Sequence, residues 1–258
     1  MKISAMILVG DNEPYLERCI QSIENCVDEI VVVLDKLEAR DDVLHEKIKI
    51  INQEGTDDYA AWRNQAMEHC TGDWVLWLDA DELLSFVDGT LLKKEDLAKF
   101  IMSHNNRAKT CSYDLFTLHF MYDYKTIDGR NNGDHWSHDR LIRKAAFDEE
   151  SEVNNKTYKV KFVLPMHERI NWLPEQMDNC HIRVPLRDNP PIIFHYGHCK
   201  GLEDVRRKYA QYMRIFPEAF EKAGIKNVDE YCAKHEVFTK QRPLIYYGGK
   251  HPKSLGLW

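Results

Sequence analysis

WVLWLDADE, residues 74–82, decides the fold of this chain, because five apolar residues run directly into acidic ones. A short, uninterrupted apolar run is typical of a parallel strand buried on both faces. Open α/β sheets bind ligands at the carboxyl ends of their strands, where Asp79 and Asp81 fall. If the chain stays extended there, both carboxylates lie on one face and can converge on one divalent cation. The alternative is a solvated acidic turn.

The residues before this stretch alternate between strand and helix patterns. Three further apolar runs predict strands: Ile3–Val9, Glu29–Leu34 and Lys47–Ile51. Apolar residues at helical spacing follow Pro14, and Thr56 is expected to cap a second helix that runs to about Cys70. Strands that alternate with helices predict a parallel sheet with right-handed crossovers.

The remainder of the chain is less regular. Further strands are predicted at Leu115–Tyr122, Leu141–Phe147, Tyr158–Leu164 and Ile192–Tyr196. Further helices are predicted at Leu92–Ser103, Leu202–Phe216 and Val228–His235. The polar, glycine-containing segment Tyr124–His138 is interpreted as a mobile loop over the site, and Gln241–Trp258 as an ordered tail or lid.

Composition excludes several classes of protein. The formal charge of −7 disfavours nucleic acid as the main partner. Seven cysteines without a CxxC pair predict neither a disulfide framework nor a zinc knuckle, which favours a reducing, cytoplasmic location. No apolar run approaches the roughly 20 residues that span a membrane, so any membrane contact is expected to be peripheral, at the inner face. No secretory signal pattern precedes the first strand.

Two more polar residues are predicted near the same edge of the sheet. Asp35 follows the second strand and could accept a hydrogen bond from a nucleotide base, or could be a turn residue that ends the strand. Arg63 lies inside the helix before the acidic strand. It is either an exposed surface cation or a planar donor directed at a diphosphate or base.

Three stretches together resemble the family 2 glycosyltransferases of GT-A fold, in particular the lipopolysaccharide-core glucosyltransferase-like branch. They are AMILVGDNEPYLERCIQSI (5–23), DEIVVVLD (28–35) and AAWRNQAMEHCTGDWVLWLDADE (60–82). The resemblance implies a Rossmann-like αβα sandwich with a central mixed, mostly parallel sheet and a helical C-terminal extension. One departure is KLEARDD (36–42), which stands where the family has small residues.

The resemblance also implies roles for individual residues. The nucleotide sugar would be bound by Val9, Asp35, Arg63, Asp79, Ala80 and Asp81. Of these, Asp79 would lie on the ribose or diphosphate side, and Asp81 would bind Mn²⁺ or Mg²⁺. IIFHYGHCKGLEDVRRKY (192–209) resembles the family's late histidine and basic helix, which makes His195 a third metal ligand beside Asp81 and Asp79.

An inverting transferase needs a general base that deprotonates the acceptor hydroxyl. LPMHERI (164–170) resembles the family's "HE" element, which makes Glu168 the candidate base. The alternative for Glu168 is a surface ion pair with Arg169. Asp139, in SHDRLIRK (137–144), is the competing carboxylate.

The expected function is an inverting, metal-dependent transfer of a hexose from a UDP-sugar, UDP-glucose by default, to a hydroxyl of a glycan or glycolipid. The expected division is a transferase domain over 1–240 (nucleotide-sugar half 1–82, acceptor half 83–200, C-terminal helices 201–240) with a tail over 241–258.

One rival function is that of a sugar-1-phosphate nucleotidyltransferase, although VGDNEP (9–14) lacks the glycine- and arginine-rich loop of those enzymes. The other is a module that binds nucleotide sugar or glycan without turnover. A nicotinamide dehydrogenase is disfavoured because GxGxxG is missing.

Overall fold

The computed structural model describes residues 1–10, 13–35, 46–53, 58–104, 110–129, 136–153, 156–164, 169–177, 180–200, 202–233 and 244–255. The chain divides into two units that interleave along the sequence. Unit 1 comprises Met1–Thr117, Trp136–Phe194 and Gly249–Trp258, and unit 2 comprises Leu118–His135 and His195–Gly248. The divisions expected from the sequence at residues 82, 200 and 240 stay predictions.

A mixed, mostly parallel sheet runs through unit 1 and confirms the expected α/β fold class. Its strands, in spatial order, are β3 (Ile48–Gln53), β2 (Glu29–Asp35), β1 (Ile3–Val9), β4 (Trp74–Asp79), β8 (Trp136–Arg143) and β6 (Ser112–Met121). β3, β2, β1 and β4 are parallel to one another, whereas β8 is antiparallel to both β4 and β6. Strand order reverses between β1 and β4, and ligands of open α/β sheets bind at such a point.

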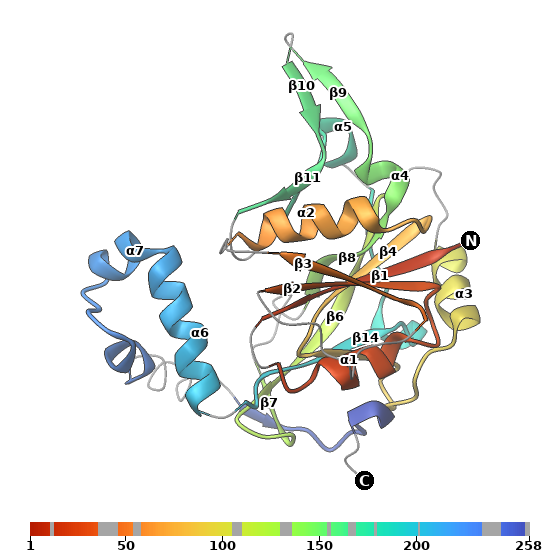
Figure 1. Ribbon diagram of the computed structural model, residues 1–258. Helices are drawn as coiled ribbons and strands as arrows, with labels where there is room; N and C mark the ends of the chain where they lie inside the picture. The colour runs from red at the N-terminus through yellow and green to blue at the C-terminus, as the bar shows by residue number, and fades with distance from the viewer. Residues whose placement is uncertain are drawn as a thin grey trace. The chain divides into compact units, whose positions relative to one another are not determined.

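Helices cover both faces of this sheet (Figure 1). They are α1 (Leu16–Ile23), α2 (Tyr59–His69) and α3 (Lys94–His104). Because side chains alternate along a strand, Ile7 and Val9 of β1 enter the core that α1 and α3 complete, whereas Met6 and Leu8 enter the core on the side of α2. Burial on both faces explains why these strands are apolar throughout.

Short elements complete unit 1. Two antiparallel pairs form separate small sheets: β9 (Glu150–Val153) with β10 (Lys156–Lys159), and β11 (Lys161–Val163) with β12 (Arg169–Asn171). Figure 1 shows β9 and β10 projecting away from the main sheet. The other elements are β5 (Glu82–Ser85), α4 (Lys144–Phe147), α5 (Pro174–Met177), β13 (His181–Arg183), η2 (Leu186–Asp188), the start of β14 (Ile192–His198) and η3 (Lys253–Leu255). Of these, β13 lies parallel to β6.

Unit 2 combines a small antiparallel ladder with helices. The end of β6 pairs with β7 (Thr126–Asp128), and β7 pairs with β15 (Leu244–Tyr246). The helical part contains α6 (Leu202–Ile215), α7 (Pro217–Lys222) and a turn of helix over 228–233. Tyr231 packs edge-on against Tyr209 and Phe220, with ring centroids 4.6 and 4.9 Å apart. Within the described ranges, no helix has both the length and the apolar character to span a membrane.

The structure corrects three expected elements. The cap of α2 is Asp58, whose carboxylate accepts the backbone N–H of Ala61 at 3.0 Å, while Thr56 lies outside the described residues. The strand expected to reach Phe147 ends at Arg143, because α4 begins at Lys144 with two alanines, the best helix formers. The segment Tyr124–His138 contains β7 and the start of β8, so it is not a loop throughout.

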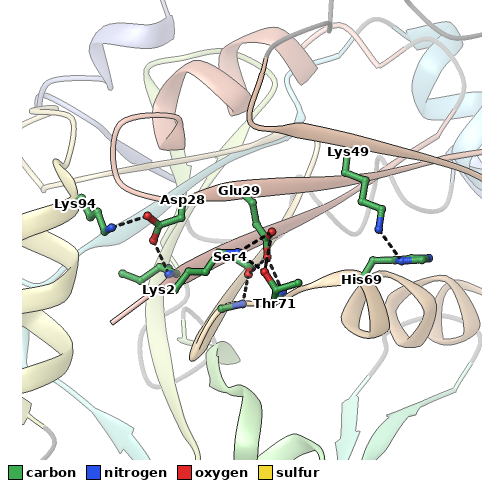
Figure 2. A network of polar contacts seen from close by, with 10 residues as sticks. Lys2, Ser4, Asp28, Glu29, Lys49, His69, Thr71 and Lys94 are labelled. Carbon is green, nitrogen blue, oxygen red and sulfur yellow. Dashed lines mark hydrogen bonds and ion pairs between the residues drawn. The ribbon is translucent and has the colours of Figure 1, made fainter.

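A polar network ties together the amino-terminal ends of β1, β2 and β4 (Figure 2). The Glu29 carboxylate accepts hydrogen bonds from Ser4 Oγ at 2.5 Å and from the Thr71 backbone N–H at 2.6 Å. Gly72 is the residue after Thr71, and a Cβ atom at this position would lie 2.6 Å from the backbone nitrogen of Ser4. Glycine is therefore required by the close approach of two chain segments.

This network predicts a pH-dependent contribution to stability. Burial raises the pKa of Glu29, but the hydrogen bonds from Ser4 and Thr71 outweigh it and leave the pKa below its ordinary value of 4.5. The ionised carboxylate therefore stabilises the folded state above pH 4.5, and this contribution is lost as the pH falls through the lowered pKa. Glu29→Gln is expected to reduce the free energy of unfolding by about 1–3 kcal/mol at pH 7.

Urea unfolding from pH 7 to pH 3 would measure this effect. The difference between wild type and Glu29→Gln should shrink on acidification, whereas Glu68→Gln, on an exposed position of α2, should change little at any pH. A difference that grows toward low pH would contradict the assignment.

Candidate active site

β4 delivers Asp79 to the carboxyl edge of the sheet, beside the end of β1. Leu8 of β1 is the register partner of Asp79, and Val9, the last residue of β1, is fully buried. The sequence analysis expected an extended chain with Asp79 and Asp81 on one face. The chain is instead not extended through Asp81, because residues 80 and 81 form a turn before β5. The Asp79 side chain is 41% exposed, whereas Ala80 and Asp81 are buried.

Arg63 is not a surface cation, because its side chain is only 2% exposed. Its Nη2 donates to Asp79 Oδ1 at 2.5 Å, and its guanidinium carbon lies 4.0 Å from the centroid of the Trp77 ring. The helix before the acidic strand thus contributes a fixed cation to the site. The structure places Arg63 at the same sheet edge as Asp79, in contact with the Asp79 carboxylate. The predicted contact of Arg63 with a diphosphate or base stays a prediction.

A second buried ion pair lies next to the first. Arg140 of β8 donates from Nη1 and Nη2 to the two carboxylate oxygens of Glu82, at 2.7 and 2.8 Å. Glu82 Oε2 also accepts the backbone N–H of Asp79 at 2.8 Å. The Arg140 guanidinium carbon lies 3.8 Å from the Trp77 ring centroid, so Trp77 contacts both arginines. Cation–π contacts of this kind hold guanidinium groups in place.

The two carboxyl groups of this cluster have opposite pKa shifts. Burial raises the pKa of Asp79, but the Arg63 and Arg140 guanidinium groups outweigh it and hold the pKa below its ordinary value. Burial, together with the negative charges of Asp79 and Asp81, raises the pKa of Glu82 to about 7 in spite of Arg140. Asp79 is therefore the ionised group that faces solvent, and Glu82 is the buried group beneath it.

The predicted base, Glu168, lies outside the described residues, as does the rest of 165–168. The strands on either side of this connection are described. Asn64, next to Arg63 on α2, holds β11 through two hydrogen bonds with Phe162, from Nδ2 to the carbonyl oxygen at 3.0 Å and from the backbone N–H to Oδ1 at 2.8 Å. The chain segment that leads into residues 165–168 is therefore anchored beside the arginine of the site.

The competing base, Asp139, is 16% exposed and surrounded by donors. Its carboxylate accepts hydrogen bonds from Ser112 Oγ and from Trp172 Nε1 at 3.0 Å, and His181 Nδ1 lies 2.9 Å from it. The backbone carbonyl of Asp139 accepts from Trp77 Nε1 at 2.5 Å. These contacts tie Asp139 into unit 1 and occupy its carboxylate.

Two other predicted ligands stay predictions. Asp35 is the last residue of β2, beside the end of β1, and its side chain lies outside what the structure describes. His195 belongs to unit 2, where its Nδ1 lies 2.9 Å from His119 Nδ1, while Asp79 and Asp81 belong to unit 1. Among the residues that the structure describes, no three His, Cys, Asp or Glu side chains form a group that could hold a metal.

The sequence analysis assigned no role to Glu82, Trp77 or Asn64. A usable signal was present. Arg140 is followed by Leu141 and Ile142 in a buried strand, and a buried cation needs a partner. The identity of that partner, 58 residues away, was not readable from local pattern.

Comparison with known proteins matches residues 4–150 to the model described as "Glycosyl transferase family 2". An uncharacterized glycosyltransferase of Rickettsia typhi is 31% identical over 121 residues, which cover 45% of this chain and 38% of that protein. A TPR repeat-containing protein of Synechococcus elongatus is 34% identical over 96 residues, or 36% of this chain and 24% of that protein. The matched segments thus span well under half the length of these relatives.

Comparison with solved structures gives matches of low sequence identity. TarS of S. aureus superposes with a TM-score of 0.39 and 19% identity over 57% of this chain and 29% of its own. The mannosyltransferase PcManGT of Pyrobaculum calidifontis, solved with GDP-Man and Mn²⁺, has a TM-score of 0.35 and 16% identity over 45% of this chain and 35% of its own.

Proposed function

Since this chain belongs to glycosyl transferase family 2, we propose that it moves a hexose from a nucleoside diphosphate sugar to a hydroxyl of a glycan or glycolipid, with inversion at the anomeric carbon. UDP-glucose is the default donor. The lipopolysaccharide-core glucosyltransferase-like branch is the proposed subgroup, on the residues quoted from 5–23, 28–35 and 60–82.

One observation carries the proposal: an ionised carboxylate at the strand-order reversal of the sheet, backed by buried arginines. Asp79 lies at the end of β4, beside β1, and Arg63 and Arg140 hold its pKa down. An open sheet binds its ligand at this point. Val9 and Asp35, at the ends of the two neighbouring strands, are proposed to contact the base.

The charges of the cluster fit a divalent cation. Asp79 and Asp81 stand two residues apart at the carboxyl edge of the sheet, where β4 ends. Carboxylate oxygens are the ligands that Mg²⁺ and Mn²⁺ prefer, so Asp81 and Asp79 would hold the ion, with His195 as the proposed third ligand. Such an ion, when bound, neutralises charge on a diphosphate leaving group.

Glu168 is the proposed general base. Asn64 anchors the strand before residues 165–168 to α2, next to Arg63, which supports a place for this segment near the donor. The carboxylate of Asp139 is already engaged by Ser112 and Trp172, which disfavours it for this role. Glu168 would accept the proton of the acceptor hydroxyl as the oxygen attacks the anomeric carbon.

We also propose a cytoplasmic location, with any contact at the inner face of the membrane peripheral. The proposal depends on the cysteine pattern of the sequence, an odd number without a CxxC pair. Closure of the 124–138 segment and of the 241–258 tail over the donor would exclude water from the reaction, because hydrolysis competes with transfer.

A thermal-shift panel of UDP, GDP, CDP and ADP, each with and without MnCl₂, tests donor binding. UDP with MnCl₂ is expected to raise the melting temperature most, and a ligand at 100 times its Kd adds about 2.7 kcal/mol of stability. Release of UDP from UDP-glucose, followed by chromatography, then tests turnover. Binding without turnover would indicate a binding module, and no shift with any nucleotide would contradict the proposal.

A further inference from the structure

We propose that Asp139 is a positioning residue: its carboxylate holds a bulge in β8 that places Arg140 against Glu82, and Glu82 in turn holds the backbone of Asp79 at the donor site. This inference rests on the proposed function, because it assigns Asp139 to the donor site of that reaction.

The bulge is visible in the pairing of β6 with β8. Tyr113 pairs with Leu141, and Leu115 pairs with Ser137, so a single residue of β6 faces residues 138–140 of β8. Asp139 has a φ of 53°, in the left-handed region that a non-glycine residue keeps only where its surroundings hold it there. A bulge of this kind redirects the side chain that follows it.

The surroundings hold Asp139 through both its backbone and its side chain. Its N–H donates to Asp114 Oδ1 at 3.0 Å, and its carbonyl accepts from Trp77 Nε1. Its Oδ1 accepts from Ser112 Oγ and lies 2.9 Å from His181 Nδ1, while Oδ2 accepts from Trp172 Nε1. The Asp139 carboxylate thus connects β8 to β6, to β13 and to Trp172, which follows β12. The backbone carbonyl of Asp139 connects β8 to β4.

Arg140 is the residue that this arrangement directs. Arg140 resumes the alternation of β8 directly after the bulge, so it shares the face of Ile142, on the side of the core that contains Trp77. In the bulged strand Arg140 is buried, contacts Trp77 and forms the two-pronged ion pair with Glu82. Glu82 then accepts the N–H of Asp79, the residue that precedes the turn to Asp81.

Asp139→Asn is the informative variant, because asparagine keeps the size of the side chain and also tolerates the left-handed region. The amide carries no charge and has one acceptor oxygen where the carboxylate has two, so the hydrogen bonds from Ser112 Oγ and Trp172 Nε1 weaken and the bulge loses part of its support. We expect the affinity for UDP with MnCl₂, measured by calorimetry, to fall about 10- to 100-fold. The turnover number for UDP-glucose at saturating donor should fall by a smaller factor.

Tyr113→Phe is the matched control. It removes a hydrogen bond to the carbonyl of Ile101 from the residue next to Ser112 on the same strand, whose ring lies in the core on the other face of the sheet from Trp77. It should lower the melting temperature and leave the affinity for UDP with MnCl₂ unchanged. A double-mutant cycle tests whether Asp139 acts through Arg140. If it does, Asp139→Asn introduced into the Arg140→Lys variant should weaken the affinity for UDP with MnCl₂ by less than about 3-fold.

Several results would overturn the inference. A turnover number reduced about 1000-fold with unchanged UDP affinity would make Asp139 the base itself. Unchanged affinity and unchanged turnover, or full additivity with Arg140→Lys, would also refute it. If Asp139→Asn does not fold, Trp172→Phe removes one donor to the same carboxylate and should weaken the affinity about 3- to 10-fold; an unchanged affinity refutes the inference. If the wild-type protein does not bind UDP, the proposed function is wrong, and so is this inference, which rests on it.

Discussion

Asp81→Asn is expected to lower metal-dependent turnover of the donor at least 100-fold while the protein stays folded. Asparagine keeps the size of the side chain but removes the negative charge that a divalent cation requires from its ligand. Asp81 is buried in the turn after β4, so a substitution of equal size limits the effect on packing. Initial rates of UDP release from UDP-glucose at saturating MnCl₂ would measure the change.

Two comparisons make this result specific. Glu95→Gln, at an exposed position of α3, removes one carboxylate elsewhere and should leave turnover unchanged. Asp79→Asn should reduce turnover and also stability, because Asp79 is the partner of the buried Arg63. If Asp81→Asn keeps wild-type turnover and wild-type dependence on MnCl₂, the metal assignment is wrong.

Glu82→Ala is expected to lower the free energy of unfolding by about 3–5 kcal/mol at pH 8. At this pH the carboxyl of Glu82, whose pKa is raised to about 7, is ionised in wild type. The variant leaves the guanidinium group of Arg140 buried without its counter-charge, and the backbone N–H of Asp79 loses its acceptor. Urea unfolding followed by tryptophan fluorescence would measure the loss.

A double-mutant cycle separates the ion pair from packing. Arg140→Met should be strongly destabilising as well, since it leaves the carboxyl group of Glu82 buried without its counter-charge. The double variant Glu82→Leu with Arg140→Met removes both charges together and should cost less than the sum of the two single variants. Strict additivity, or a loss below about 1 kcal/mol for Glu82→Ala, would show that the pair does not organise this edge of the sheet.

The strands and helices that position the site were predictable because their signals are local. Burial on both faces requires an unbroken apolar run, and β1, β2 and β4 carry one each. Their predicted limits agree with the structure to within one residue. Predictions were weaker where one residue type suits two structures, as in Lys144–Phe147, where alanines that read as part of a strand form α4.

The acidic strand end was predicted from sequence, but the partners of its carboxylates were not. For Arg63 the sequence left two interpretations open, an exposed surface cation and a donor directed at a ligand. The fold places it against Asp79, 16 residues further along the chain. Glu82 is the last residue of WVLWLDADE, yet its role depends on the ion pair with Arg140. Arg140 in turn follows a bulge that is held by Ser112, Trp172 and His181. A bulge changes the register by local backbone conformation, which apolar patterning does not encode.

Local sequence patterns were enough to predict an α/β sheet, an acidic strand end at its carboxyl edge and a resemblance to one family of transferases. Each of these follows from neighbouring residues, whose apolar spacing and charge are set within a few positions. The pairing of each arginine with its carboxylate could be found only in the folded chain. Arg140 and Glu82 are 58 residues apart and Asp139 and His181 are 42 apart, so their contacts exist only once the strands have paired. The burial that makes those contacts strong is likewise a property of the folded chain.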